Sequence, residues 1–212
     1  MKRFASSGFS LVEILVASVI SLIVMLGIGS IFLTAFTAQM KSLRQARVQI
    51  AATQVSKLFS RDMYQTQYIV QPAVGGSGTV LEGYIGIQKI GPPGTVWAYA
   101  IPGSTQYTRF LYCIGGASGN EFYRYQDAWS LPAMPTAITP CGTGGFTDKP
   151  VTNPYLVAWC TGGAGTCFSR PPNRETQAGM AITITAPLAG GQPPVSLVVT
   201  TTGFAQIPVI AP

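Results

Sequence analysis

The chain has 212 residues, of which only 9% are charged, and its composition includes 24 glycines and 16 prolines. That length suits one globular domain together with a long helix, since single domains commonly span about 100–150 residues. Because the chain has no histidine, Ser-His-Asp and Cys-His catalysis are excluded, as are metal sites that need an imidazole ligand. The formal net charge of +6 is a weak basic bias that permits contact with anionic lipids, cell-surface polymers or nucleic acid but singles out none of them.

The first 38 residues combine a short basic start with a long apolar run. Lys2 and Arg3 precede the stretch Gly8-Phe9-Ser10-Leu11-Val12-Glu13, and residues 15–38 carry no charge. An α-helix needs about 20 apolar residues to cross a bilayer core, whereas the hydrophobic region of a secretory signal has only about 7–15. The run therefore predicts a membrane-spanning helix. Glu13 at its head is a functional candidate, because an acid in or near lipid is costly.

At these residues the chain resembles the type IV pilin family, which includes the pseudopilins of type II secretion. In that family a prepilin peptidase removes a short basic leader after a glycine, and the exposed phenylalanine is N-methylated. The resemblance implies that residues 1–8 are a cleaved leader, with the cut between Gly8 and Phe9 and methylation of Phe9. It also implies a role for Glu13 in subunit assembly, where this acid meets the N-terminal amine of a neighbouring subunit.

The helical pattern continues beyond the apolar run, because no Gly or Pro lies between Ser30 and Pro72. We expect one helix from about residue 9 to about residue 68, with a hydrophobic transmembrane and polymerisation part, residues 9–38, and an amphipathic continuation, residues 39–71. Gly27 and Gly29 in the first part fit close helix packing or local flexibility, and equally a passive role, since glycine is common in membrane helices. Major pilins usually have proline where this chain has Ser30, a departure that many minor pilins share. The apolar stripe of the continuation is Val48, Ala51, Ala52, Val55, Leu58 and Phe59.

Residues 72–212 are expected to form a β-rich globular head. Short segments rich in β-branched and aromatic residues predict strands, and turn sequences such as Gly91-Pro92-Pro93-Gly94 separate them. Residues 129–154 predict a long surface loop. The whole predicts an α+β fold, in which the amphipathic helix packs on an antiparallel sheet, and the resemblance implies the lollipop-shaped pilin arrangement. The predicted strands are residues 80–90, 96–101, 107–114, 121–126, 155–160, 180–186, 195–202 and 204–210.

All four cysteines lie in the expected head, at Cys113, Cys141, Cys160 and Cys167. Their even number and the lack of a C-x-x-C spacing fit zinc binding poorly and favour disulfides, which imply an oxidising compartment. Four cysteines allow three pairings, and sequence alone does not choose among them. The flexible loop between Cys160 and Cys167 favours a bond between those two, which leaves Cys113 for Cys141.

Aromatic residues and two arginines are interleaved between Tyr107 and Tyr125. On a hairpin such residues could form a stacking surface for single-stranded nucleic acid or sugar. The favoured interpretation instead places one aromatic set in the core and leaves Arg109 and Arg124 on the solvent face. Asp127 and Asp148 are interpreted as solvated loop acids. The sequence therefore predicts no enzyme activity, no cofactor and no metal.

Taken together, these features predict a minor type IV pilin, most similar to the PilW-like group, that primes or supports pilus assembly near the filament tip. It would serve adhesion, twitching motility or DNA uptake as part of that machine. The alternatives are a type II secretion pseudopilin, a major filament-forming pilin, and a stand-alone membrane-anchored binding module that keeps residues 1–8.

The expected partners are other pilins and minor pilins, which the chain meets through its N-terminal helix, and the prepilin peptidase. A nucleic-acid or surface ligand is left open. The expected location is the inner (cytoplasmic) membrane before assembly, with the head in the periplasm or outside, and the extracellular pilus afterwards.

Overall fold

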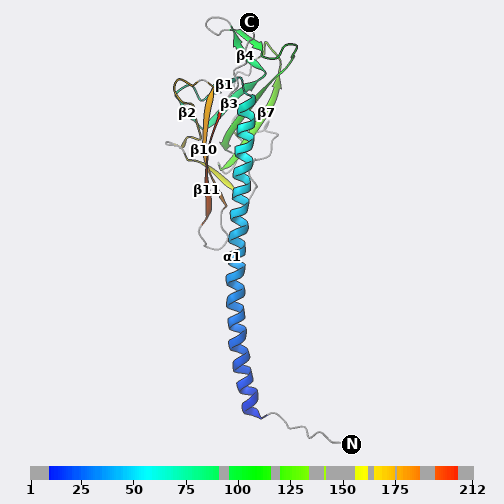
Figure 1. Cartoon of the computed structure of the whole chain (residues 1–212), viewed down its shortest axis with the longest axis vertical. Coiled ribbons are helices and arrows are strands. Elements are labelled where there is room, and N and C mark those ends of the chain that lie inside the picture. The colour runs from blue at the N-terminus through cyan, green and yellow to red at the C-terminus, as the bar shows by residue number, and fades with distance from the viewer. Residues whose placement is uncertain are drawn as a thin grey trace, which may run out of the picture. The chain divides into compact units, whose positions relative to one another are not determined.

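The computed structural model describes residues 10–90, 96–115, 120–133, 141, 156–161, 165–174, 176–186 and 194–204. The chain divides into two compact units, residues 1–43 and residues 44–212. The elements in chain order (Figure 1) are α1 Leu11–Gln65, β1 Tyr68–Gln71, β2 Ser77–Gly78, β3 Val80–Ile85, β4 Ile87–Ile90, β5 Val96–Tyr99, β6 Tyr107–Gly115, β7 Glu121–Trp129, β8 Val157–Cys160, β9 Phe168–Ser169, β10 Gln177–Ala186 and β11 Val195–Phe204.

The first unit consists, among the described residues, of the N-terminal part of α1. Every side chain from Leu11 to Leu43 is exposed, although most of them are apolar. An amphipathic helix of a soluble domain buries one apolar stripe, whereas this part is apolar all round and buries none. The helix therefore needs an apolar environment that the chain itself does not supply.

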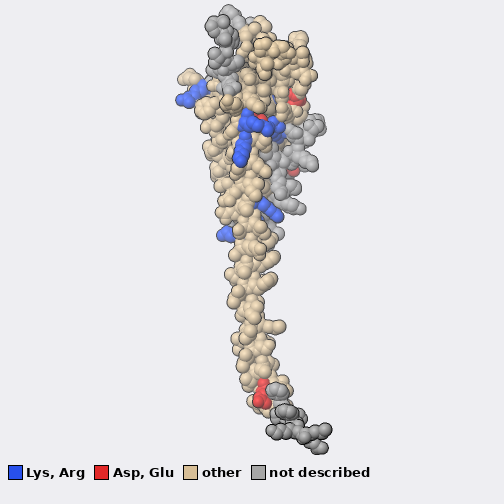
Figure 2. Space-filling view, turned by 45° about the vertical axis from the view of Figure 1, so that its right-hand side comes forward, with Lys and Arg blue, Asp and Glu red and all other residues tan. Residues whose placement is uncertain are grey.

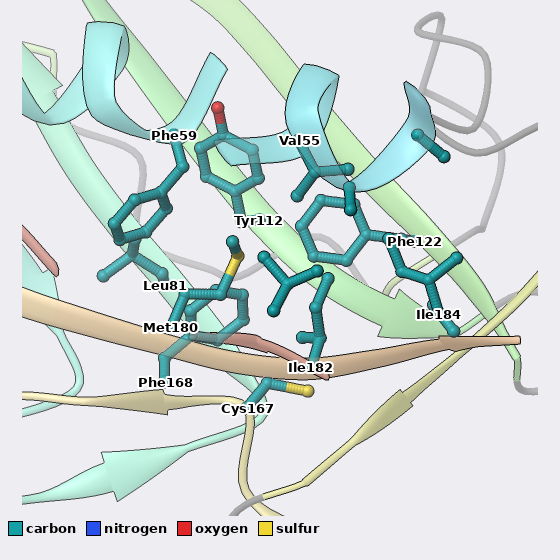
Figure 3. Close-up of a cluster of buried hydrophobic side chains, with 14 of the residues drawn as sticks. Val55, Phe59, Leu81, Tyr112, Phe122, Cys167, Phe168, Met180, Ile182 and Ile184 are labelled. Atoms are coloured by element: carbon teal, nitrogen blue, oxygen red, sulfur yellow. The ribbon is translucent and has the colours of Figure 1, made fainter. Parts of the chain in front are cut away.

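The second unit is built on the C-terminal part of α1, which buries the predicted stripe. Val48, Ala51, Ala52, Val55 and Phe59 are all buried, while Leu58 is half-buried. These side chains meet two sheets, and Figure 3 shows Val55 and Phe59 of the helix in one cluster with Tyr112 and Phe122, while Met180, Ile182 and Ile184 lie below them in this view. Burial of each such side chain contributes about 1.5–3 kcal/mol, so this shared core holds the unit together.

Three antiparallel sheets form the β part of this unit. Sheet A has the strand order β1-β3-β6-β7, sheet B has the order β11-β10-β9-β2 with β8 also paired to β10, and sheet C is the hairpin β4-β5. Burial in β10 alternates strictly, with Met180, Ile182 and Ile184 on the core side. A period of two is the signature of a strand that faces a core on one side only.

The structure confirms the α+β fold, with a long N-terminal apolar helix and antiparallel sheets. It differs from the expectation at several boundaries. The helix ends at Gln65, and residues 68–71 form strand β1 instead of its continuation. The predicted strand 80–90 is broken at Gly86, whose φ of 91° is a left-handed conformation that glycine adopts without strain.

Two further predictions concern segments that are only partly described. Strand β11 runs on without a break to Phe204, whereas a break had been expected after residue 202, and residues 205–210 of the last predicted strand lie outside the described residues. In the predicted loop 129–154, residues 134–140 and 142–154 also lie outside them.

Candidate functional site

The start of α1 carries the acid that the sequence singled out. The carboxylate of Glu13 accepts a hydrogen bond from the backbone N–H of Ser10 (2.9 Å), and the backbone N–H of Glu13 donates to the Ser10 hydroxyl (3.2 Å). This reciprocal arrangement is a capping box, which satisfies two backbone donors that a helix start leaves without partners. It holds the Glu13 side chain folded back toward the residue that precedes the helix. Gly8 and Phe9 lie outside the described residues.

The helix that follows Glu13 has the dimensions of a membrane segment. Within the described residues, α1 is long and apolar enough to cross a membrane, judged by length and composition. No charged residue occurs between Glu13 and Lys41, and Figure 2 shows this stretch as an unbroken tan surface on the visible face. Glu13 is therefore an isolated charge at one end of a long apolar surface.

Four hydroxyl groups within this apolar stretch, those of Ser18, Ser30, Thr34 and Thr37, bond to carbonyls of the helix itself. The Ser30 hydroxyl donates to the carbonyl of Gly27 (2.8 Å), and the Thr34 hydroxyl donates to the carbonyl of Ser30 (2.9 Å). Such internal bonds make polar side chains tolerable where water is absent. Gly27 and Gly29 have no heavy atom within 4 Å of the position where a Cβ would stand, so no described residue packs against them. This surface is suited to close packing with another helix.

Residues 3–35 match the family model of the prokaryotic N-terminal methylation motif. The matched segment begins within the predicted leader and contains Gly8, Phe9, Glu13 and most of the apolar run, and it supports a type IV pilin or pseudopilin. Proteins with this motif are typically structural and are processed by prepilin peptidase before they assemble with other pilins. The chain matches no curated protein and no solved structure. The methylation motif thus bears on the N-terminal segment, and the head has to be understood from its own chemistry.

In the head, a buried carboxylate on the helix binds two side chains of sheet A. Asp62, only 1% exposed, accepts hydrogen bonds at Oδ2 from Arg124 Nε (2.6 Å) and from the Tyr112 hydroxyl (2.6 Å). At Oδ1 it accepts from Arg61 (3.2 Å), whose side chain is largely exposed. Burial, followed by the negative charge of Asp62, raises the pKa of Tyr112, so its hydroxyl remains a donor at any ordinary pH.

A second buried group centres on Arg109, on the opposite face of the same hairpin. Its guanidinium donates from Nε (3.0 Å) and Nη2 (2.9 Å) to the two oxygens of Asp127, in the bidentate geometry that gives the strongest ion pairs. Asp127 also accepts from Trp129 Nε1 (2.5 Å) and the Tyr125 hydroxyl (3.2 Å). The guanidinium carbon lies 5.6 Å from the ring centroids of both aromatics, within cation–π range.

These two groups correct three predictions. Arg109 is 3% exposed and the Arg124 side chain 13%, so neither arginine is on the solvent face as expected. Asp127 is not a loop acid but part of strand β7, paired directly with Arg109 in the register of the sheet. Asp148 lies outside the described residues. One signal was available, since Asp62 falls three residues after Phe59 on the apolar stripe, where an acid requires a buried partner.

Both disulfides of the favoured pairing are formed in the structure, Cys113–Cys141 and Cys160–Cys167. The first ties residue 141 to the end of β6. Cys141 lies so close to Gly115 that a Cβ added at Gly115 would stand 2.7 Å from the Cβ of Cys141. The second joins the end of β8 to the residue before β9. Closing loops of these lengths stabilises a fold by about 2–4 kcal/mol each. No group of three metal-ligating side chains occurs among the described residues.

The Asp62 cluster predicts a large difference between two neighbouring substitutions. Asp62→Ala removes the carboxylate shared by Arg124 and Tyr112, so we expect the free energy of unfolding to fall by about 3–5 kcal/mol. Arg61→Ala removes only the exposed member, with a cost of at most about 1 kcal/mol. Urea unfolding of the full chain in detergent measures both. Equal losses for the two variants would contradict a buried anchoring role for Asp62.

A pH-dependent prediction follows from Glu82 on β3, which is 4% exposed and accepts a weak hydrogen bond from Tyr84 (3.4 Å). Burial raises the pKa of Glu82 above 4.5, and the opposing effect of Arg109, whose Nη1 lies 3.9 Å away, does not reverse the shift. The folded state therefore holds this proton more tightly than the unfolded state, so the contribution of Glu82 to stability falls as pH rises through that raised pKa.

Glu82→Gln keeps the shape of the side chain but cannot ionise. We expect the melting temperature of the variant minus that of the unaltered chain to increase as the pH rises from about 4 to 7. The reason is that only the unaltered chain must then bury a charge. Circular dichroism melts across this range test it. A difference that stays constant or shrinks as pH rises would show that charged Glu82 is not a burden on the fold.

Proposed function

We propose that the chain is a minor type IV pilin, a non-catalytic structural subunit that prepilin peptidase cuts after Gly8 and that assembles through its N-terminal helix. The observation that carries this proposal is the position of Glu13, an isolated carboxylate at the start of a helix. As far as Met40, the residues that follow it in this helix are uncharged and exposed. The match to the methylation motif over residues 3–35 supports the processing step. The inner membrane is the proposed location before assembly and the extracellular pilus afterwards.

The chemistry of assembly follows from the environment of Glu13. Removal of the leader at the Gly8-Phe9 junction creates a positive amine on Phe9, beside the Ser10–Glu13 capping box. In the filament the carboxylate would meet the amine of a neighbouring subunit. A pair of unit charges 4 Å apart interacts with about 4 kcal/mol at an effective dielectric of 20, compared with about 1 kcal/mol in water. An apolar filament core would thus favour the arrangement in which the carboxylate of Glu13 lies next to the N-terminal amine of the neighbouring subunit.

A low-copy position near the filament tip is supported by two features. Ser30 stands where major pilins usually have proline, and the head is a large, disulfide-tied body suited to specific contacts with different pilins. The presence of Glu13 favours a place just below the extreme tip, because this acid needs the amine of another subunit above it. Adhesion, twitching motility or DNA uptake would then depend on the chain only through the assembled machine.

Mass spectrometry of sheared filaments tests processing and place together. We expect a mature N-terminus at methylated Phe9 and an amount of this chain far below that of the main subunit. An intact leader would contradict the processing step. If this chain dominated the filaments it would be a major pilin, and if it were absent from pili but required for protein secretion it would be a pseudopilin.

Two single substitutions separate the charge of Glu13 from its capping role. Glu13→Ala removes both the carboxylate and half of the capping box, and we expect incorporation into filaments to fall at least about tenfold, in line with the loss of one charge pair. Ser10→Ala breaks the box at a cost of about 1 kcal/mol but keeps the carboxylate, so incorporation should be largely retained. Quantitative immunodetection in sheared filaments measures both, with mature N-termini checked for each variant. Equal loss in the two variants would mean that the helix cap, not the charge, matters.

A further inference from the structure

Sheet B differs from sheet A in its charge. The described strands of sheet B, namely β2, β8, β9, β10 and β11, contain no Asp, Glu, Lys or Arg. The strands of sheet A contain Glu82, Arg109, Glu121, Arg124 and Asp127. The described strands of sheet B therefore offer no charged side chain to phosphates, uronic acids or cationic groups. The nearest charge at its β11 edge is that of Lys57 on α1, which lines a shallow hollow together with Val198 and Thr200.

The outer face of sheet B can be assigned from its register. Ile182 and Ile184 of β10 point into the core, so Ala181, Thr183 and Thr185 point away from it. Thr183 pairs with Trp159 of β8 on one side and with Val198 of β11 on the other. These three side chains form one transverse row on the outer face, which spans about 10 Å because neighbouring strands lie about 4.8 Å apart.

This row is open to solvent and is surrounded by hydroxyl groups. Trp159 is 48% exposed and Val198 57%. The Thr161 and Thr183 hydroxyls are hydrogen-bonded to each other (3.0 Å) beside the indole, which keeps them fixed in place. The register continues over ten residue pairs between β10 and β11 without a bulge, so the face is regular. The hydroxyl-bearing residues on it are Thr161, Thr183, Thr185, Ser196, Thr200 and Thr202.

The mixture of one exposed indole with many hydroxyls discriminates between possible occupants. A lipid surface or the apolar face of another protein would bury these hydroxyls without partners, at a cost of about 1–3 kcal/mol each. A charged polymer gains no ion pair from the strands of this face. A neutral sugar chain meets both requirements, because the C–H groups of a pyranose ring pack on an indole while its hydroxyls bond to threonine.

From this arrangement we propose that the outer face of sheet B binds a neutral, extended polysaccharide, with one pyranose ring on Trp159 and its hydroxyls bonded to Thr183 and Thr161. An unbroken ladder of ten residue pairs favours extended, ribbon-like chains such as β-linked glucans over coiled ones. This binding activity is independent of the N-terminal helix and of the system in which the chain assembles.

The test uses the full chain in detergent micelles, with cellohexaose as the probe and a hexamer of galacturonic acid as its charged counterpart. We expect isothermal titration to detect cellohexaose binding that does not change between about 0.05 and 0.5 M salt, since no charge pair is screened. The charged hexamer should not bind. A chain that binds no cellohexaose, or that prefers the charged hexamer in low salt, overturns the proposal.

Substitutions locate the site. Trp159→Ala should weaken binding about tenfold or more, the equivalent of about 1.4 kcal/mol, whereas Trp159→Tyr, which keeps an aromatic face, should retain most of the affinity. Tyr64→Ala is the matched control, because Tyr64 is 63% exposed but lies on α1. Its affinity should be unchanged, and circular dichroism melts confirm that each variant is folded. Equal effects at Trp159 and Tyr64 would contradict the site. So would a Trp159→Ala variant that keeps its sugar affinity, and a changed oligomeric state of that variant would make this face a contact between copies.

Discussion

The head depends on the attachment of α1 to sheet A through Asp62. The apolar stripe of the helix supplies most of the burial, but the hydrophobic effect itself is not directional. The carboxylate of Asp62, by contrast, meets Arg124 Nε and the Tyr112 hydroxyl at 2.6 Å each, and only one placement of the helix satisfies both donors. A buried pair of this kind adds little net stability but is very costly to separate, so it selects one register of helix on sheet.

Charge is used differently by the two large sheets of the head. Sheet A buries two arginines against acids, one on the side of the helix at Arg124 and one on the opposite side at Arg109. Sheet B has no charge on its described strands, and its stability comes from strict alternation of core and outer residues in β10. The hairpin β6-β7 is therefore fixed by ion pairs and hydrogen bonds on both faces. The outer face of sheet B contributes the hydrogen bond between the Thr161 and Thr183 hydroxyls.

The sequence predicted best what is local and repetitive. The long helix, its apolar first part and the stripe from Val48 to Phe59 follow from periodicity within one segment, and the assembly motif is contiguous. Contacts between distant elements were harder to predict, because Arg109 binds Asp127 and Arg124 binds Asp62, which lie 18 and 62 residues away in the sequence. A lone arginine in a strand suggests a solvent-facing position until its acid is known. The break at Gly86 and the early strand β1 were missed for the same reason, since tertiary pairing decided them.

The self-contained hydrogen bonding of the N-terminal part of α1 has a consequence for movement. Ser30 and Thr34 give their hydroxyl protons to carbonyls of their own helix, and no charge occurs between Glu13 and Lys41. These hydroxyls exchange no polar partner when lipid around the helix is replaced by the apolar surfaces of other helices. Removal of the helix from a bilayer would then meet almost no electrostatic barrier along its length, and the one abrupt step would come at Glu13, when a single carboxylate changes its surroundings.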